Sequence, residues 1–179
     1  MKKEIKIAIS GKSGCGNTTI SRLTSDTLGL CFINFTFRTL AHERGLDLKT
    51  VLELAAEDDS WDREVDCRQV AIARESSGGC VLGSRLAIWM LEEADLKIYL
   101  EASPDIRAQR IANRENEDLA EVAAFTEERD RQDHNRYLRI YDIDTEDHSF
   151  VDMIINTDNL TPQEIVDLII KKAGEVSPD

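Results

Sequence analysis

The chain has 179 residues, 41% of them hydrophobic, which is enough to bury one substantial core and predicts one domain rather than two. Its formal net charge of −13 at pH 7 opposes binding to nucleic acid and to anionic membranes, so we expect neither partner and favour a small soluble ligand. No apolar run has the length of a signal-peptide core or a membrane span, so we expect a cytoplasmic protein. A monomer is the favoured state.

The first half of the chain alternates short apolar runs with helical patterns. The run "IKIAIS" (5–10) predicts a strand, and a glycine-rich turn connects it to a helix over 18–28 that Gly29 ends. A second strand is predicted at 30–33, followed by short helices over 37–45 and 48–59. A longer helix begins at Ser60 and stops at the break at Ser77, before a third strand at 80–83.

The second half continues this alternation. A fourth strand at 96–101 precedes a helix with Ser103 as its N-cap and Pro104 in its first turn. A fifth strand at 152–156 precedes a last helix that begins with a capping box from Thr161 to Glu164. Residues 115–150 are crowded with Glu, Asp and Arg, which predicts a solvated, mobile excursion from the core.

Apolar strands that alternate with helices and lack a polar face are typical of a parallel sheet covered on both sides. We therefore predict an α/β fold with a five-stranded parallel sheet and helices on both faces. No repeat or low-complexity linker interrupts the pattern. The cysteines show no metal-ligand spacing and lie beside apolar residues, so reduced thiols that behave as small buried hydrophobes are expected for Cys15, Cys31, Cys67 and Cys80.

The glycine-rich turn at 11–19 nearly matches the nucleotide-binding pattern G-x-x-x-x-G-K-[ST]. Between a strand and a helix, the backbone N–H groups of such a loop converge on phosphate oxygens, helped by the helix dipole. Thr18 supplies the hydroxyl that would bind Mg²⁺, the expected cofactor, together with ATP. The predicted ATP-binding residues are Gly11, Lys12, Ser13, Gly14, Cys15, Gly16, Asn17, Thr18 and Thr19.

Asn17 stands where this pattern has its lysine. That lysine normally neutralises the β- and γ-phosphates, so its loss is expected to weaken transfer more than binding, by roughly 3 kcal/mol if it acts as one preorganised donor. Lys12 offers a replacement, since "GKSGCGNT" resembles the loop G-K-G-G-x-G-K-[ST] of certain partitioning ATPases, which keep both lysines. The alternative is that Lys12 is a solvated loop lysine.

Charged residues at helical spacing form two candidate phosphate-binding faces. Phosphoryl transfer depends on positioning and on neutralising charge, so two such faces closing over a triphosphate would suit it. Surface salt bridges among the abundant glutamates would give the same spacing. The two sets are Arg107, Arg110 and Arg114 on one helix, and Arg129, Asp133 and Arg136 on another.

Eight segments along nearly the whole chain carry a family resemblance. They are "SGKSGCGNTT", "FRTLAHERG", "DREVDCRQ", "SRLAIWM", "ADLKIYLEAS", "RIANRE", "ERDRQDHNRYLRIYDID" and "MIINTD". Each segment is modest alone, but eight in matching order are hard to produce by chance. The sequence resembles the cytidylate kinases, especially the short archaeal-type branch of the nucleoside monophosphate kinases.

The resemblance implies a P-loop kinase fold and one kinase domain over 1–179, with a monophosphate-binding segment at about 34–76 and a lid at about 111–137. It also implies transfer of the γ-phosphoryl group of Mg·ATP to CMP or dCMP, giving ADP and CDP or dCDP. The arginines that match family arginines for the acceptor phosphate or the transferred group are Arg38, Arg63, Arg85, Arg129 and Arg136. Asp133 matches an acid that helps to place the substrate and the lid. The predicted catalytic residues are Lys12, Arg129, Asp133 and Arg136.

The chain departs from the family pattern at the phosphate and metal machinery. Besides Asn17, it has Gly83 and Ser84 where the family shows an acid and a glycine before the arginine. Asp62 and Asp66 are acids that would compensate, or else cap or solvate their helix. Two hypotheses therefore stand beside a kinase: a binding or regulatory module without efficient turnover, and another phosphotransferase of the same fold, such as a shikimate or nucleoside kinase.

Overall fold

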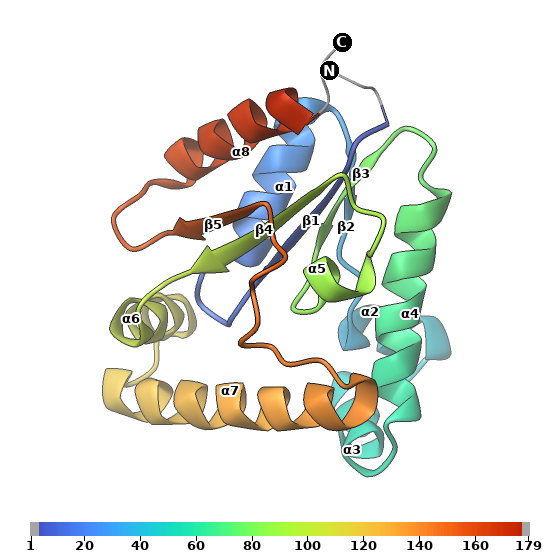
Figure 1. Cartoon of the computed structure of the whole chain (residues 1–179). Helices are drawn as coiled ribbons and strands as arrows, with labels where there is room; N and C mark the ends of the chain where they lie inside the picture. Colours follow the sequence, from blue (N-terminus) through green and yellow to red (C-terminus); the bar gives the residue numbers. More distant parts are fainter. Residues whose placement is uncertain (1–3, 177–179) are drawn as a thin grey trace.

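Five parallel strands form the central sheet, in the order β2-β3-β1-β4-β5 (Figure 1). The structure, a computed structural model, describes residues 4–176. All neighbouring strands run parallel, so their carboxyl ends lie along one edge of the sheet. The strands are β1 (Lys6–Gly11), β2 (Cys31–Ile33), β3 (Cys80–Gly83), β4 (Leu96–Glu101) and β5 (Met153–Asn156).

Helices cover both faces of the sheet and its carboxyl edge (Figure 1). One face packs against α1 (Asn17–Leu28) and α8 (Pro162–Val176), and the other against α4 (Ser60–Glu75) and α5 (Ala87–Met90). The helices near the carboxyl edge are α2 (Phe37–Arg44), α3 (Leu48–Glu57), α6 (Pro104–Glu115) and α7 (Leu119–Tyr141). In the described part of the chain, no helix has both the length and the apolar character needed to cross a membrane.

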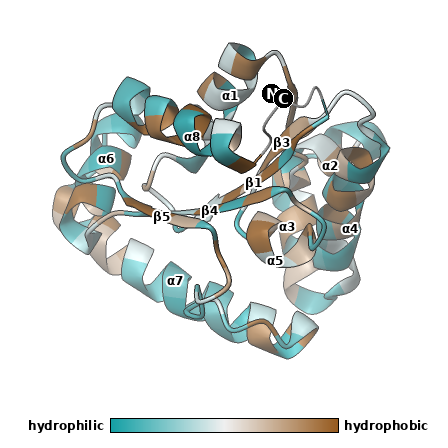
Figure 2. Cartoon of the chain, turned by 45° about the horizontal axis from the view of Figure 1, so that its top comes forward, coloured by the Kyte–Doolittle hydropathy of each residue, from teal (hydrophilic) through white to brown (hydrophobic). Residues whose placement is uncertain are grey.

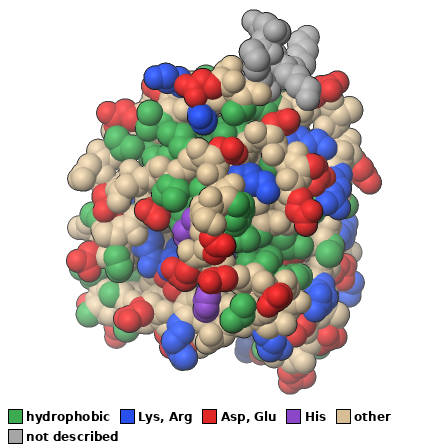
Figure 3. All heavy atoms as spheres, in the orientation of Figure 1, with side chains coloured by type: hydrophobic (Ala, Val, Ile, Leu, Met, Phe, Trp, Pro, Cys, Tyr) green, Lys and Arg blue, Asp and Glu red, His purple; other side chains and the backbone are tan. Residues whose placement is uncertain are grey.

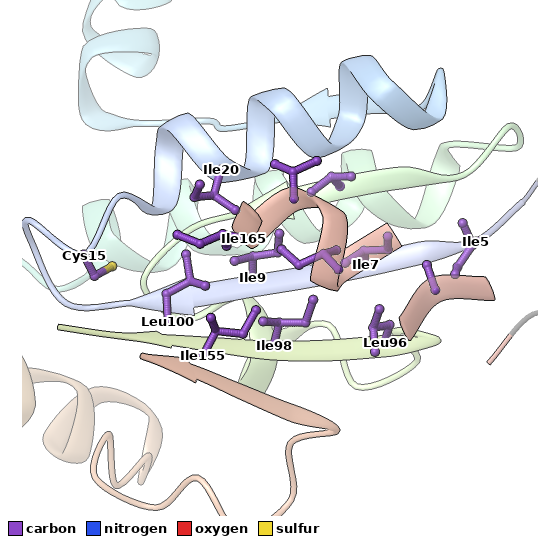
Figure 4. Close-up of a cluster of buried hydrophobic side chains, with 14 residues drawn as sticks. Ile5, Ile7, Ile9, Cys15, Ile20, Leu96, Ile98, Leu100, Ile155 and Ile165 are labelled. Carbon is purple, nitrogen blue, oxygen red and sulfur yellow. The ribbon is translucent and has the colours of Figure 1, made fainter. Parts of the chain in front are cut away.

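The side chains of the central strand alternate between two cores. Ile7 and Ile9 of β1 lie in the core beneath α1 and α8, whereas Ala8 lies in the core on the α4 side. Figure 4 shows the first core, where Ile20 of α1 and Ile165 of α8 pack beside the isoleucines of β1. Burying one such side chain stabilises the fold by about 1.5–3 kcal/mol. The two cores hold the carboxyl edge of the sheet in a fixed position.

The predicted five-stranded parallel α/β fold is confirmed. The capping box is also present: Glu164 accepts a hydrogen bond from the backbone N–H of Thr161 at 2.7 Å, and Thr161 Oγ1 accepts one from the Glu164 N–H at 3.3 Å. Ser103 occupies the N-cap position of α6, but its side chain makes no capping hydrogen bond. The expectation of buried cysteines holds for Cys15 and Cys80 and is wrong for Cys31 and Cys67, which are exposed.

Most of the segment expected to be a solvated excursion is the 23-residue helix α7. The Asp118 side chain caps this helix by accepting hydrogen bonds from the backbone N–H groups of Ala120 and Glu121. In Figure 2, much of the α7 ribbon has the colour of hydrophilic residues. The prediction of a solvated segment is nevertheless wrong for the opposite face, whose buried residues are Val122, Thr126, Asp133, Tyr137 and Ile140. These few residues recur at helical spacing, which is sufficient to pack the helix.

Candidate active site

A cleft of about 710 Å³ opens at the carboxyl edge of the sheet. Ligands of open parallel sheets bind at this edge, where the strand order changes direction. β1 lies at that point, between β3 and β4. The cleft is lined by residues 11–20, by the turn that follows β3, by one face of α4, and by parts of α6 and α7. A cleft of this size can hold a small-molecule ligand.

The cleft concentrates positive charge on an acidic protein. Figure 3 shows acidic and basic side chains intermixed over one face of the molecule, as expected for a chain of net charge −13. The cleft instead has two carboxylates in its lining, Asp62 and Asp66, against six cationic side chains. Its cationic side chains are Lys12, Arg85, Arg110, Arg114, Arg129 and Arg136. Local charge of this sign attracts an anionic ligand against the sign of the whole protein.

The loop between β1 and α1 has the backbone conformation of a phosphate-binding turn. Gly14 has φ +85°, and a Cβ at this position would lie 2.7 Å from the carbonyl oxygen of Arg107, so only glycine fits. Gly16, also left-handed with φ +95°, is the N-cap of α1 and lines the cleft. Residues 11–19 all line the cleft, and ATP binding by them stays a prediction. The positive end of the α1 dipole therefore faces the site.

Asn17, which replaces the expected lysine, turns its side chain toward β3. Its amide donates to the backbone carbonyl of Ser84 at 3.2 Å, and its Oδ1 accepts from Ser21 Oγ at 2.9 Å. Gly83 allows α1 to lie this close to β3, because a Cβ at position 83 would lie 2.6 Å from the Cβ of Ser21. Asn17 and Gly83, which both depart from the family pattern, thus belong to one packing arrangement between α1 and β3. An acidic side chain at position 83 does not fit this arrangement.

Lys12 lines the cleft, and its ammonium group is paired with an acid from a distant segment. Its Nζ lies 2.8 Å from Glu146 Oε1, in the loop after α7. The Lys12 side chain is 35% exposed. The hydrogen bond from Lys12 lowers the pKa of Glu146, so the acid stays ionised near neutral pH. A phosphate group in the loop would compete with Glu146 for this lysine.

Asp133, buried on α7, gathers the predicted arginines. Its Oδ1 accepts from Arg136 Nη2 at 2.8 Å, and its Oδ2 lies 3.9 Å from Arg129 Nε. Arg85, in the turn after β3, donates to Asp133 Oδ2 and also to Ser13 Oγ of the phosphate-binding loop. One carboxylate thereby accepts hydrogen bonds from two guanidinium groups, those of Arg85 and Arg136, and forms a longer ion pair with a third, that of Arg129. Arg129, Asp133 and Arg136 thus lie together as helical spacing predicts, and Arg85 joins them from the turn after β3.

The remaining arginines differ in position. Arg63 donates to the carbonyl of Ile140 at 2.8 Å, and Arg38 is exposed and outside the residues that line the cleft. Arg107 is buried; it donates one hydrogen bond to the carbonyl of Ser13 in the loop and forms an ion pair with Asp130 of α7. Arg110 donates to Thr157 at 2.9 Å and lines the cleft together with Arg114. Of the first predicted arginine face, therefore, two members border the cleft and one is structural.

One face of α4 presents hydrogen-bond acceptors to the cleft, at residues 62, 66 and 69. Asp66 accepts from the Tyr141 hydroxyl at 2.8 Å and from Gln69 Nε2 at 3.0 Å. Burial raises the pKa of the Asp66 carboxyl to about 6, although the hydrogen bond from Tyr141 acts in the opposite direction. Burial also raises the pKa of Asp62, which lies near Arg136. Sequence reasoning noted the two acids but missed Gln69, whose only signal is its i, i+3 relation to Asp66.

The donors around the loop suit Mg²⁺ brought in with a nucleotide. Thr18 is an exposed residue in the first turn of α1 and lines the cleft. Magnesium is commonly held by one or two protein oxygens together with substrate phosphates rather than by a protein cage. Residues 4–176 contain no group of three or more His, Cys, Asp or Glu side chains arranged to hold a metal.

Comparison with known proteins agrees with this geometry. A model of the cytidylate kinase-like family matches residues 6–159. A protein named cytidylate kinase 2 from Borreliella afzelii is 44% identical over 169 residues, covering 92% of this chain and 94% of the relative. A cytidylate kinase from Pyrococcus horikoshii is 37% identical over 179 residues, covering 99% of this chain and 92% of the relative.

Solved structures share the fold. Shikimate kinase from Acinetobacter baumannii, in complex with shikimate, superposes with a TM-score of 0.68 at 16% identity, over 99% of this chain and 97% of that one. An uncharacterized protein from Eubacterium ventriosum superposes with a TM-score of 0.69 at 18% identity, over 94% of this chain and 98% of that one. The fold is that of the P-loop kinases. The family model and these sequence relatives show that the chain belongs to the cytidylate kinase-like family of phosphotransferases.

Proposed function

We propose that this protein is a nucleoside monophosphate kinase that transfers the γ-phosphoryl group of Mg·ATP to CMP or dCMP. The observation that carries the proposal is the group of three arginines that Asp133 holds beside the phosphate-binding loop. Relatives named cytidylate kinase support this substrate class. Phosphoryl transfer needs such positioned cations and little covalent chemistry from the protein.

In the proposed reaction, an oxygen of the acceptor monophosphate attacks the γ-phosphorus in line. A new P–O bond forms on the acceptor, the bond to the β-phosphate oxygen breaks, and ADP leaves with the electron pair of that bond. Thr18 would hold Mg²⁺ together with the phosphates, and the ion would supply charge neutralisation. Arg129 and Arg136 stabilise the equatorial oxygens of the group in transfer, and Asp133 positions both arginines.

Two cations near the loop are proposed to replace the missing lysine. Arg85 is already hydrogen-bonded to Ser13 of the loop, so its guanidinium is held within reach of bound phosphates. Lys12 is proposed to exchange Glu146 for a phosphate oxygen when ATP binds. Asn17 contributes to packing against Ser84 rather than to phosphate charge.

The acceptor phosphate is assigned to Arg38, Arg63 and Arg85 within the monophosphate-binding segment of about 34–76 and the turn after β3. Arg85 has the firmest support, because it lines the cleft. Arg63 must release the carbonyl of Ile140, and exposed Arg38 must fold inward, before either can reach a phosphate. The lid of about 111–137 would correspond to the end of α6 and most of α7; α6 contacts the loop through the hydrogen bond from Arg107 to the carbonyl of Ser13.

A second candidate function is nucleotide binding without efficient turnover. Asn17 and Gly83 favour it, because together they remove a cation and an acid from the phosphate and metal machinery. The retained arginines favour the kinase. We further propose that the protein acts as a cytoplasmic monomer that binds neither nucleic acid nor membrane, in keeping with its charge of −13.

A coupled assay of ADP release tests the proposed function. The purified protein is mixed with ATP and Mg²⁺ and with CMP, dCMP, UMP, AMP or GMP in turn. A kinase of this specificity releases ADP fastest with CMP or dCMP, and Gly16→Val, which removes the left-handed glycine before α1, abolishes the release. Nucleotide binding without ADP release from any acceptor would favour the second candidate.

A further inference from the structure

One wall of the cleft is the face of α4 that carries hydrogen-bond acceptors. This face is distant in sequence from the loop at residues 11–19. Asp62, Asp66 and Gln69 lie at i, i+4 and i+7, so their side chains point to the same side of the helix. Asp62 and Gln69 are each only 3% exposed. Polar side chains so deeply buried need hydrogen-bond partners, since an unmet group costs about 1–3 kcal/mol.

Two acceptors on this wall have no partner within residues 4–176: Gln69 Oε1 and Asp62 Oδ2. The orientation of the Gln69 amide follows from its neighbour, because its Nε2 donates to Asp66 Oδ1 at 3.0 Å. With the amide nitrogen committed to that carboxylate, the amide oxygen remains without a donor. Asp66 itself accepts one hydrogen bond on each oxygen, from Tyr141 and Gln69, and has acceptor capacity left.

The space beside these acceptors has apolar walls. Phe35, Phe37 and Val65 line the same cleft, and they pack together as one cluster with Trp61 and Leu40. Aromatic side chains of this kind offer faces to a planar ring. The combination of apolar walls with a row of unmet acceptors fits a flat heterocycle that carries N–H donors on one edge.

We propose that Asp66 and Gln69 read the base of the acceptor nucleotide by accepting hydrogen bonds from its exocyclic amino group. This inference rests on the proposed function and names the residues that set its substrate choice. The 4-amino group of cytosine carries two N–H donors, one for the Asp66 carboxylate and one for Gln69 Oε1. Uracil has a carbonyl oxygen at that position, which would face two acceptors and leave them unmet.

This mechanism is expected to discriminate strongly between CMP and UMP. A site built to hydrogen-bond a substrate donor rejects an analogue that lacks it, because the buried acceptors then stay unpaired. Tyr141 acts as a positioning residue, since its hydroxyl holds Asp66 from α7 at 2.8 Å. The base wall and the lid helix are thereby connected through one hydrogen bond.

The test is calorimetric binding of CMP, UMP and AMP to the full chain, without ATP. Wild type should bind CMP at least roughly tenfold more tightly than UMP. Asp66→Asn places an N–H donor opposite the base, so the ratio of UMP to CMP dissociation constants should fall at least tenfold. Glu75→Gln is the matched control: it makes the same change of charge on an exposed residue of α4 and should leave the ratio unchanged.

Gln69→Met supplies a second variant, which removes the unmet acceptor at similar volume and should also lower the ratio. Equal binding of CMP and UMP to wild type, or an unchanged ratio in folded Asp66→Asn or Gln69→Met, overturns the inference. AMP that binds as tightly as CMP would overturn the assignment to cytosine. CDP formation with an unchanged ratio refutes the base-reading role alone, whereas selective CMP binding without CDP formation refutes the proposed function alone.

Discussion

The side-chain amide of Asn17 donates a hydrogen bond to the backbone carbonyl of Ser84 at 3.2 Å, which ties the first turn of α1 to the turn after β3. That turn also contains Arg85, whose guanidinium reaches back to Ser13 of the loop. The residue that replaces the usual lysine therefore helps to fix the segment that supplies a cation to the site. Asn17 and Arg85, the arginine that we propose compensates for the missing charge, are therefore connected through this turn.

Asn17→Ala should lower the free energy of unfolding by about 1–2 kcal/mol, because it removes hydrogen bonds to Ser84 and from Ser21. ATP affinity should change by less than about threefold, since backbone N–H groups hold the phosphates. Urea denaturation and calorimetry measure the two quantities. In a double-mutant cycle, Ser21→Ala should show coupling to Asn17→Ala of roughly 0.5–1 kcal/mol. A large loss of ATP affinity at unchanged stability would contradict the packing role of Asn17.

Lys12→Ala should lower the kinase rate at least tenfold if Lys12 exchanges Glu146 for a phosphate of ATP. Glu146→Gln is the matched variant, because it removes the competing carboxylate and leaves the lysine in place. Its rate should equal or exceed that of wild type, and its affinity for ATP should rise. Steady-state kinetics with CMP compares the variants. Equal rates for wild type and Lys12→Ala would leave Lys12 with only its ion pair to Glu146.

Arg129→Ala or Arg136→Ala should lower turnover about a hundredfold, roughly 2.7 kcal/mol of transition-state stabilisation, while ATP affinity changes far less. Both arginines are held by Asp133, so Asp133→Asn should lower turnover as well. Arg131→Ala is the control on the same helix, since Arg131 is exposed and pairs with Glu128 at 2.7 Å. Turnover that is equally sensitive to the control would show that the effect arises from general charge.

The raised pKa of Asp66 predicts a specific dependence of stability on pH. Its carboxyl has a pKa of about 6 in the folded chain against an ordinary value of 3.8, so the unfolded chain releases this proton first as pH rises. Stability contributed by protonated Asp66 is therefore full below about pH 4 and lost as pH approaches 6. Relative to wild type, the free energy of unfolding of Asp66→Asn should therefore increase by roughly 2–3 kcal/mol as the pH is raised from 4 to 7.

Denaturation of both proteins across this pH range measures that difference. The other charged and titratable groups that face Asp66 remain in both proteins, so their titration largely cancels: Asp62 on α4, and Arg136, Tyr137 and Tyr141 on α7. A difference between the two proteins that stays constant from pH 4 to 7 would contradict the raised pKa.

The sequence was sufficient to predict the frame of the site. Apolar runs with a turn after each predicted all five strands, and the glycines of residues 11–19 predicted a loop between β1 and α1 that lines the cleft. Arg129, Asp133 and Arg136 were correctly grouped, because helical spacing alone places them on one face. These features depend on local periodicity and backbone conformation, which a single sequence contains.

The partners of individual side chains could not be predicted, because they depend on tertiary packing. The ion pair between Lys12 and Glu146 joins segments more than a hundred residues apart in the chain, and no local pattern connects them. Gln69 stands out only in the folded structure, where its amide nitrogen donates to Asp66 and its amide oxygen has no hydrogen-bond donor among the described residues. The sequence did not predict that one face of α7 is buried, because the few apolar residues in this segment lie among many charged ones, a pattern typical of a solvated segment.

Direct detection of CDP tests the central claim most directly. Wild-type protein is first shown by calorimetry to bind both ATP and CMP, and is then incubated with both nucleotides and Mg²⁺ while CDP is separated and quantified. The account predicts CDP at a rate proportional to enzyme, reduced about a hundredfold by Arg129→Ala and unchanged by Arg131→Ala. A protein that binds both nucleotides, yet forms no CDP above the uncatalysed background, would contradict it.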